Sequence, residues 1–148
     1  MKVLLADDHT LFREGLRSLL ERDPAVTIAG ETGDGREALE LIDRLRPDVA
    51  ILDISMPSLS GLEVAARAQR ASPSTRIVML SMHAGEAYVA QAVRAGVAAY
   101  LLKDSAAAEL AQALRSVARG STSVPASRST SSTASSTGPR ARPTRSPR

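Results

Sequence analysis

Residues 49–57 read Val49-Ala50-Ile51-Leu52-Asp53-Ile54-Ser55-Met56-Pro57, and they set the architecture of the chain. The first four residues are continuously apolar, which is typical of a strand buried on both faces of a parallel sheet. Asp53 follows directly, although a buried carboxylate is costly unless it has a partner. Pro57 lies in the loop beyond, because proline cannot donate to a strand ladder. Ligand chemistry in open α/β sheets lies at the carboxyl ends of strands, so a reactive group is expected at Asp53.

Apolar runs and amphipathic segments alternate along the rest of the chain. Strands are predicted at 2–6, 26–30, 48–53, 76–81 and 97–102. An amphipathic helix follows each strand; the third is expected near 62–71, the fourth at 86–95 with Gly96 as a left-handed cap, and the fifth ends at Gly120. This alternation predicts βαβ units with helices on both faces of a parallel sheet. Right-handed crossovers favour a flavodoxin-like, doubly wound five-stranded sheet of order 2-1-3-4-5.

Local signals suggest how three of the helices begin. Thr10 or Asp8 is a candidate cap for the first helix, and Asp104 or Ser105 for the fifth. The segment 33–35, Gly-Asp-Gly, is interpreted as a turn before the second helix.

Charge is divided unevenly between two parts of the chain. Residues 1–119 hold all 16 acidic and 14 of the 19 basic residues, a net charge of −2, whereas residues 120–148 hold five arginines and no acid. The overall charge of +3 therefore does not indicate a nucleic-acid-binding domain. Residues 120–148 are almost entirely Ser, Thr, Pro, Arg, Ala and Gly, which predicts a disordered tail after a domain at 1–119.

Composition excludes several classes of protein. Cysteine is absent, which excludes disulfides and thiol catalysis, and two histidines are too few for a typical zinc site. No apolar run approaches the roughly 20 residues of a membrane span. The amino terminus turns acidic too early for a signal peptide. A cytoplasmic protein without membrane contact is expected.

Four of the five predicted strands end in polar residues at the same rim: Asp7-Asp8, Asp53, Ser81 and Lys103. Three crowded carboxylates repel one another, and a divalent cation would relieve the repulsion. Oxygen-only ligation suits Mg²⁺. The ammonium of Lys103 and the hydroxyl of Ser81 complete a set that suits phosphoryl transfer, with Asp53 as nucleophile.

Motifs in the same order and spacing occur in a known family. They are Leu4-Leu5-Ala6-Asp7-Asp8-His9, Leu52-Asp53-Ile54-Ser55-Met56-Pro57 with Gly61-Leu62-Glu63, Leu80-Ser81-Met82-His83, and Ala95-Gly96 through Tyr100-Leu101-Leu102-Lys103-Asp104. In these motifs residues 1–119 resemble the receiver domain of bacterial two-component response regulators, and within them the NarL/FixJ (LuxR-type) group.

The resemblance implies a role for each rim residue. Asp53 would accept a phosphoryl group from a sensor histidine kinase, and the protein would not be an enzyme. Mg²⁺ would be bound by Asp8, Asp53 and the main-chain carbonyl of Ser55, with Asp7 contributing through water. Lys103 would pair with the phosphoryl oxygens.

The resemblance also implies a conformational switch. Ser81 would move to hydrogen-bond the phosphate, and Tyr100 would turn inward to fill the space left behind. The surface formed by the fourth helix, fifth strand and fifth helix would then bind a partner or a second copy of the chain, giving a phosphorylation-dependent homodimer.

Alternatives remain open for both residues and function. Asp53 could merely cap a helix, Tyr100 could be a half-buried edge residue, and His9 and His83 are interpreted as rim residues without a ligand role. A Mg²⁺-dependent phosphatase also uses an aspartyl nucleophile, but it usually has a second acid two residues later, where Ser55 stands. An inactive interaction module is the third possibility.

Relatives of this type carry a helix-turn-helix DNA-binding domain after the receiver. Residues 120–148 lack the paired amphipathic helices of such a domain, so transcription regulation is implied by resemblance only and no specific DNA binding is expected from this chain. Either a single-domain receiver with a tail or a reading-frame change near Gly120 would explain this.

Overall fold

The computed structural model describes residues 1–120, and the predicted disordered tail therefore lies outside the described residues except for Gly120. Five parallel strands pair in the order β2-β1-β3-β4-β5, which confirms the predicted fold and strand order. The elements in chain order are β1 (Lys2–Ala6), α1 (Thr10–Glu21), β2 (Thr27–Thr32), α2 (Gly35–Leu45), β3 (Val49–Asp53), α3 (Gly61–Ala71), β4 (Arg76–Ser81), α4 (Glu86–Arg94), β5 (Ala99–Leu102) and α5 (Ala106–Ala118).

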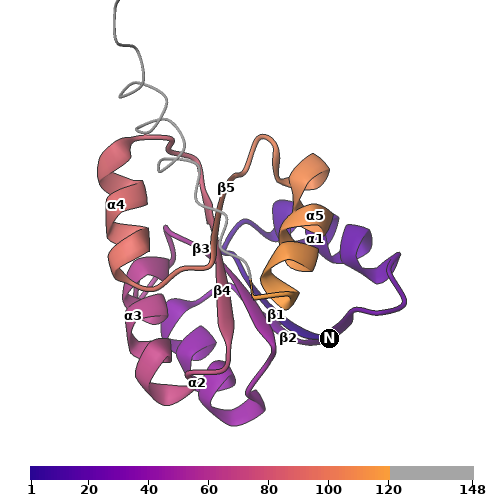
Figure 1. The fold of residues 1–148 in the computed structure, drawn as a ribbon, viewed down its shortest axis with the longest axis horizontal. Helices are drawn as coiled ribbons and strands as arrows, with labels where there is room; N and C mark the ends of the chain where they lie inside the picture. The colour runs from indigo at the N-terminus through magenta and orange to yellow at the C-terminus, as the bar shows by residue number, and fades with distance from the viewer. Residues whose placement is uncertain (121–148) are drawn as a thin grey trace, which may run out of the picture.

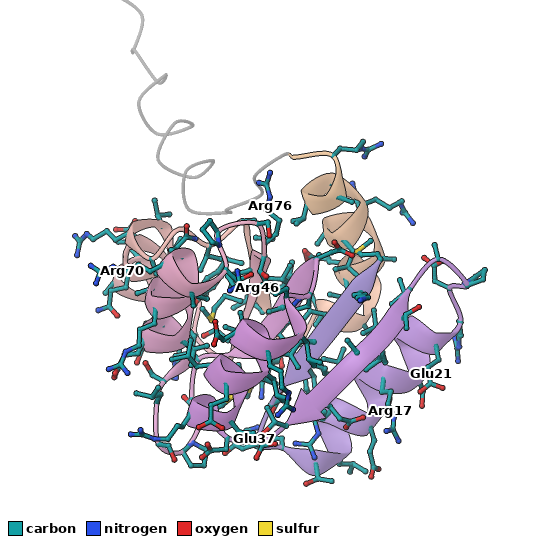
Figure 2. All side chains as sticks on the ribbon, turned by 90° about the horizontal axis from the view of Figure 1, so that it is seen from below. Arg17, Glu21, Glu37, Arg46, Arg70 and Arg76 are labelled. Carbon is teal, nitrogen blue, oxygen red and sulfur yellow. The ribbon has the colours of Figure 1, made fainter. Side chains whose placement is uncertain are left out.

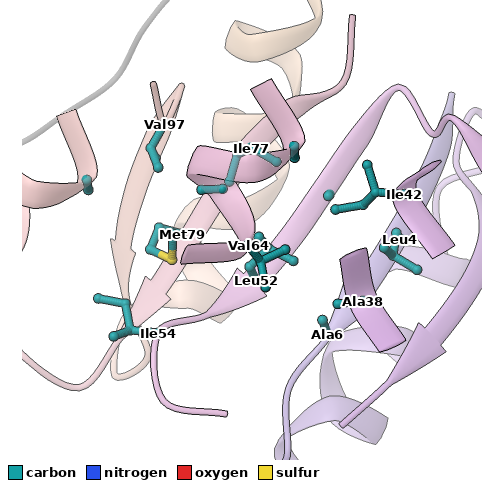
Figure 3. Close-up of a cluster of buried hydrophobic side chains, with 14 of the residues drawn as sticks. Leu4, Ala6, Ala38, Ile42, Leu52, Ile54, Val64, Ile77, Met79 and Val97 are labelled. Atoms are coloured by element: carbon teal, nitrogen blue, oxygen red, sulfur yellow. The ribbon is translucent and has the colours of Figure 1, made fainter. Parts of the chain in front are cut away.

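Helices cover both faces of the sheet, as Figure 1 shows, with α2, α3 and α4 on one face and α1 and α5 on the other. Every residue of the central strand β3 is buried, as its continuous apolar run predicts. Successive residues of a strand point to opposite faces. Leu4 of β1 thus joins the cluster under α2–α4, which Figure 3 shows with Leu52 and Met79, whereas Leu5 joins the cluster under α1 and α5.

Two helices begin with side-chain caps. The carboxylate of Asp34 accepts a hydrogen bond from Glu37 N at 2.9 Å, so the predicted turn at 33–35 contains the cap and first residue of α2. Ser60 Oγ accepts from Glu63 N at the start of α3. At the end of α4 the structure confirms Gly96 in the left-handed region, with φ of 80°.

The predicted caps of α1 are wrong, and of the two candidates for α5 the structure places Ser105 at the cap position. His9 occupies the cap position of α1 and makes no side-chain cap bond, and Thr10 is already helical. Asp8 instead lies toward the His9 ring. Ser105 stands at the cap position of α5 without a side-chain cap bond, because its hydroxyl faces the carbonyl of Leu102 at 3.5 Å.

Two strand boundaries differ from the prediction by two residues, and the starts of β2 and β3 differ by one. β2 continues to Thr32 because Ala6 pairs with Thr32 in the ladder and Asp7 N donates to the Thr32 carbonyl. β5 begins at Ala99 because Val97 N bonds back to Ala92 O of α4.

The outer surfaces of the helices carry charged side chains. Figure 2 shows Arg17 and Glu21 on α1 and Glu37 on α2 at the periphery of the molecule. Among residues 1–120, no helix combines the length and apolar character that a membrane crossing requires.

Candidate functional site

The acidic residues predicted at strand ends come together at the carboxyl edge of the sheet. β1 and β3 are neighbours, so the residues that follow β1 lie beside Asp53 at the end of β3. One ligand atom from each of Asp7, Asp8, His9 and Asp53 lies within 4.8 Å of every other. We refer to these four residues as the acidic pocket.

Lys103 reaches the acidic pocket from the residue after β5. Its Nζ lies 3.1 Å from Asp53 Oδ2, 2.9 Å from Asp7 Oδ2 and 2.8 Å from His9 Nδ1. The side chain is 5 % exposed, and the ammonium also lies 4.8 Å from the centre of the Phe12 ring. A buried ammonium so placed partly neutralises the two buried carboxylates.

The two adjacent aspartates differ sharply in environment. Asp7 is fully buried, and its Oδ1 accepts a hydrogen bond from His9 N at 2.8 Å. Its Oδ2 accepts no hydrogen bond, although Lys103 Nζ is close enough for ionic attraction. The Asp8 side chain is 37 % exposed and lies 3.5 Å from His9 Nδ1. Asp7 is thus the inner carboxylate and Asp8 the outer one.

Asp53 is held in surroundings that favour its neutral form. Burial raises the pKa of Asp53 from 3.8 to about 6, with the negative charge of Asp7 as the second cause. Lys103 and the Ser55 N–H act in the opposite direction and lower this pKa. Ser55 N donates to Asp53 Oδ1 at 3.3 Å, so the loop after β3 folds back over the carboxylate.

The donor set fits a divalent cation. Three carboxylates and one ammonium leave a formal charge of −2 when His9 is neutral, and Asp7 Oδ2 still lacks a hydrogen-bond donor. Carboxylate oxygens suit Mg²⁺, whereas the imidazole nitrogen of His9 is a ligand that transition metals prefer.

Ser81 and Tyr100 both bond to the backbone of His83. Ser81 Oγ accepts from His83 N at 2.8 Å and donates to His83 O at 3.2 Å, while Tyr100 donates its hydroxyl to the same carbonyl at 2.6 Å. The His83 ring stacks on Tyr88 of α4, with centroids 4.7 Å apart. These contacts connect the end of β4, β5 and α4.

The Tyr100 side chain is 2 % exposed, so the half-buried interpretation is wrong. It already points inward in this structure, whereas the resemblance implied an inward turn on phosphorylation. Burial raises the pKa of the Tyr100 phenol, which keeps the hydroxyl protonated for donation to His83 O.

His9 was expected at the rim without a ligand role, and its side chain is 60 % exposed. Sequence reasoning missed only that its Nδ1 lies 3.3–3.8 Å from a carboxylate oxygen of each of the three aspartates. Its position directly after Asp7-Asp8 was the available signal. Beside the pocket opens a cavity of about 530 Å³ with a largely apolar lining: His9, Leu11, Phe12, Met82, Lys103 and Asp104.

The sequence is similar to a known family and to several known proteins. The family described as "Response regulator receiver domain" matches residues 3–115. The uncharacterized transcriptional regulatory protein YxjL of Bacillus subtilis is 42% identical over 120 residues, which cover 81% of this chain and 55% of YxjL. The nitrate/nitrite response regulator protein NarL of Escherichia coli is 38% identical, over 80% of this chain and 55% of NarL.

Solved structures of response regulators have the same fold as this chain. The signal receiver domain of NarL from Mycobacterium tuberculosis superposes with a TM-score of 0.77 at 43% identity, covering 80% of this chain and 96% of that one. A LuxR-family response regulator from Aurantimonas gives 0.78 at 34% identity, covering 82% and 87%. The chain spans little more than half the length of the curated relatives it matches.

Proposed function

Because the chain belongs to the response regulator receiver domain family, of the NarL/LuxR type, we propose that it receives a phosphoryl group on Asp53 in a phosphorelay. One observation carries this proposal. Asp53 is buried at the end of the central strand, and the ammonium of Lys103 contacts both its carboxylate and the inner carboxylate of Asp7. A nucleophilic oxygen, compensating positive charge and carboxylate oxygens that can bind a divalent cation are the parts that phosphoryl transfer requires.

The transfer step uses the ionised carboxylate of Asp53. An oxygen of Asp53 attacks the phosphorus of a phosphohistidine on a sensor histidine kinase, and an acyl phosphate forms as the phosphorus–nitrogen bond breaks. The imidazole nitrogen keeps the electron pair of that bond, so the kinase histidine is restored. Lys103, already 3.1 Å from Asp53 Oδ2, pairs with the phosphoryl oxygens.

Asp8, Asp53 and the main-chain carbonyl of Ser55 would hold Mg²⁺, with Asp7 contributing through water. The unsatisfied Asp7 Oδ2 and the formal charge of −2 support a divalent ion there. When bound, the ion supplies positive charge that stabilises the phosphoryl oxygens during transfer.

Phosphorylation would then act through Ser81 and Tyr100. A phosphoryl group on Asp53 draws the Ser81 hydroxyl away from the backbone of His83, whose carbonyl accepts from Tyr100 and whose ring stacks on Tyr88. A bias of about 2–3 kcal/mol suffices to make a minor packing of the α4–β5–α5 surface the major one. That surface would bind a partner or a second copy of the chain.

The output is proposed from the name of the relative YxjL, which is a transcriptional regulatory protein. Residues 1–120 are proposed to control that output in the cytoplasm without turning over a substrate and without reading DNA sequence. Their role is to change which surface is available to a partner.

A phosphatase with an aspartyl nucleophile is the alternative class. Its general acid would stand two residues after the nucleophile, where this chain has Ser55. A serine hydroxyl is too weak an acid for that role at neutral pH, which favours the receiver.

The test is mass spectrometry after treatment with acetyl phosphate and Mg²⁺. The wild-type chain and the control Asp104→Asn, which alters an exposed carboxyl next to Lys103, should each gain one phosphoryl group. Asp53→Asn should gain none, and labelling that survived would remove Asp53 from the role. Repeated turnover of a phosphomonoester would favour the phosphatase, and a wild-type chain without labelling would indicate an inactive module.

A further inference from the structure

Arg13 of α1 holds the backbone of the acidic pocket in place. Its Nη1 donates to the main-chain carbonyl of Asp7 at 2.5 Å, and its Nε donates to Glu31 Oε1 on β2 at 3.1 Å. The Arg13 side chain is 18 % exposed. One guanidinium thus connects the first helix, the end of the first strand and the edge strand.

The space that Arg13 occupies exists because residue 33 is glycine. A Cβ on Gly33 would lie 3.0 Å from Arg13 Nη1 and 3.3 Å from Asp8 Cα. Contacts this tight mean that the guanidinium is enclosed between the loop after β1 and the loop after β2. Its position is therefore fixed by packing as well as by hydrogen bonds.

Hydrogen bonds fix both peptide planes that flank Asp7. Asp7 N donates to the Thr32 carbonyl at 3.0 Å, and the Asp7 carbonyl accepts from Arg13. The second of these planes leads into Asp8 and sets the direction of its side chain. Within residues 1–120 the only basic side chain within 4 Å of the Asp8 carboxylate is His9, at 3.5 Å, so the direction of the carboxylate depends on the backbone.

From these contacts we infer that Arg13 is a positioning residue for Asp8 as a ligand of the divalent cation. The inference rests on the proposed function, which makes Asp8 a ligand. Partners that orient ligands commonly affect metal affinity as strongly as a weak ligand does, because a misdirected carboxylate must be reoriented on binding.

Arg17 provides a matched control on the same helix. Its Nη1 lies 2.5 Å from Glu31 Oε2, and its Nε lies 3.5 Å from Glu21 Oε1. Figure 2 shows Arg17 and Glu21 at the periphery. Arg17 therefore shares the Glu31 carboxylate and the charge of Arg13, but no hydrogen bond joins it to the Asp7 carbonyl within the described residues.

The test measures Mg²⁺ affinity directly by isothermal titration calorimetry. Arg13→Met should weaken Mg²⁺ binding about tenfold, whereas Arg17→Met should stay within about twofold of wild type. In acetyl phosphate labelling, the half-saturating Mg²⁺ concentration of Arg13→Met should rise by the same factor. Its rate at saturating Mg²⁺ should remain close to wild type, because the nucleophile itself is untouched.

Equal Mg²⁺ affinities for the two variants would overturn the inference, and so would a loss of maximal rate without a change in affinity. If Arg13→Met does not fold, as urea unfolding will show, Arg13→Lys decides the matter. Lysine keeps the charge but cannot hydrogen-bond the Asp7 carbonyl and Glu31 at once with the forked geometry of a guanidinium. Arg13→Lys is therefore expected to bind Mg²⁺ more weakly than Arg17→Met. Equal binding by these two variants overturns the inference. A wild-type chain that neither binds Mg²⁺ nor is labelled would instead refute the proposed function.

Discussion

Lys103 Nζ lies 3.1 Å from Asp53 Oδ2, and this contact joins the residue after β5 to the end of the central strand β3. Both side chains are almost completely buried. The same ammonium also pairs with Asp7. Breaking a buried ion pair by removing one partner is costly because it leaves the other charge without compensation.

Lys103→Met should therefore lower the free energy of unfolding by about 3 kcal/mol at neutral pH. Saturating Mg²⁺ should restore part of that loss, because a divalent cation can replace the missing charge. Urea unfolding with and without Mg²⁺ measures both effects. Lys2→Met, at an exposed lysine on the opposite edge of the sheet, is the control and should change little. An unchanged unfolding midpoint for Lys103→Met would contradict the ion-pair argument.

Asp53→Asn should stabilise the fold at neutral pH, because Lys103 still pairs with Asp7 and is not left without compensation. The pKa of Asp53 is about 6 in the folded chain against an ordinary value of 3.8, so the folded state binds the proton more tightly. The stability linked to that proton is present below about pH 4 and is lost as the pH rises through about 6. At pH 7 the ionised group costs about 1–3 kcal/mol, which asparagine avoids.

Thermal or urea unfolding of wild type and Asp53→Asn from pH 4 to pH 8 tests this. The stability difference should grow as the pH rises and should be small at the acidic end. Glu40→Gln, which neutralises an exposed carboxyl of α2, should show no such trend. The prediction would be contradicted if Asp53→Asn were less stable than wild type at neutral pH.

Labelling by acetyl phosphate should depend on pH through the same group. The attacking oxygen must be ionised, so the rate should fall as the pH drops through the pKa of Asp53, near 6 without added cation. Positive charge near the carboxylate lowers its pKa, so the midpoint should move to lower pH as Mg²⁺ is raised. Rate–pH profiles at two Mg²⁺ concentrations check this, and a midpoint independent of Mg²⁺ would count against ligation by Asp53.

Gly61→Ala should disturb the loop that carries Asp53 and Ser55. A Cβ at Gly61 would lie 2.1 Å from the Asp53 carbonyl oxygen, so the backbone must move, and a loss of about 2 kcal/mol or more is expected. Gly15→Ala on α1 meets nothing within 4 Å and should gain up to about 1 kcal/mol from helix propensity. The two melting temperatures should therefore shift in opposite directions, and labelling should slow only in Gly61→Ala.

The fold was predictable because its signals are local or follow from general rules of chain topology. The apolar run before Asp53 identifies a strand buried on both faces, and the carboxyl ends of parallel strands must share one edge. Those two facts suffice to bring Asp7, Asp8 and Lys103 to Asp53. Right-handed crossovers and a length near 120 residues favoured the strand order.

Two of the missed features depend on contacts between distant parts of the chain. The extension of β2 to Thr32 follows from its pairing with Ala6, and the contact of His9 with Lys103 joins residues 94 positions apart. The pairing leaves no mark in the neighbouring sequence, and the signal for His9 is its place directly after Asp7-Asp8. The side-chain caps of α1 and α5 are missing for a local reason, because Asp8 lies toward the ring of the adjacent His9 and the Ser105 hydroxyl donates to the nearby Leu102 carbonyl.

The His83 segment has one more consequence. The chain contains two tyrosines and no tryptophan. One tyrosine, Tyr88, stacks on the His83 ring, and the other, Tyr100, bonds to the His83 carbonyl. All of the tyrosine fluorescence of the protein therefore originates beside a single loop, and the chain carries a built-in optical probe of the backbone that links β4 to α4.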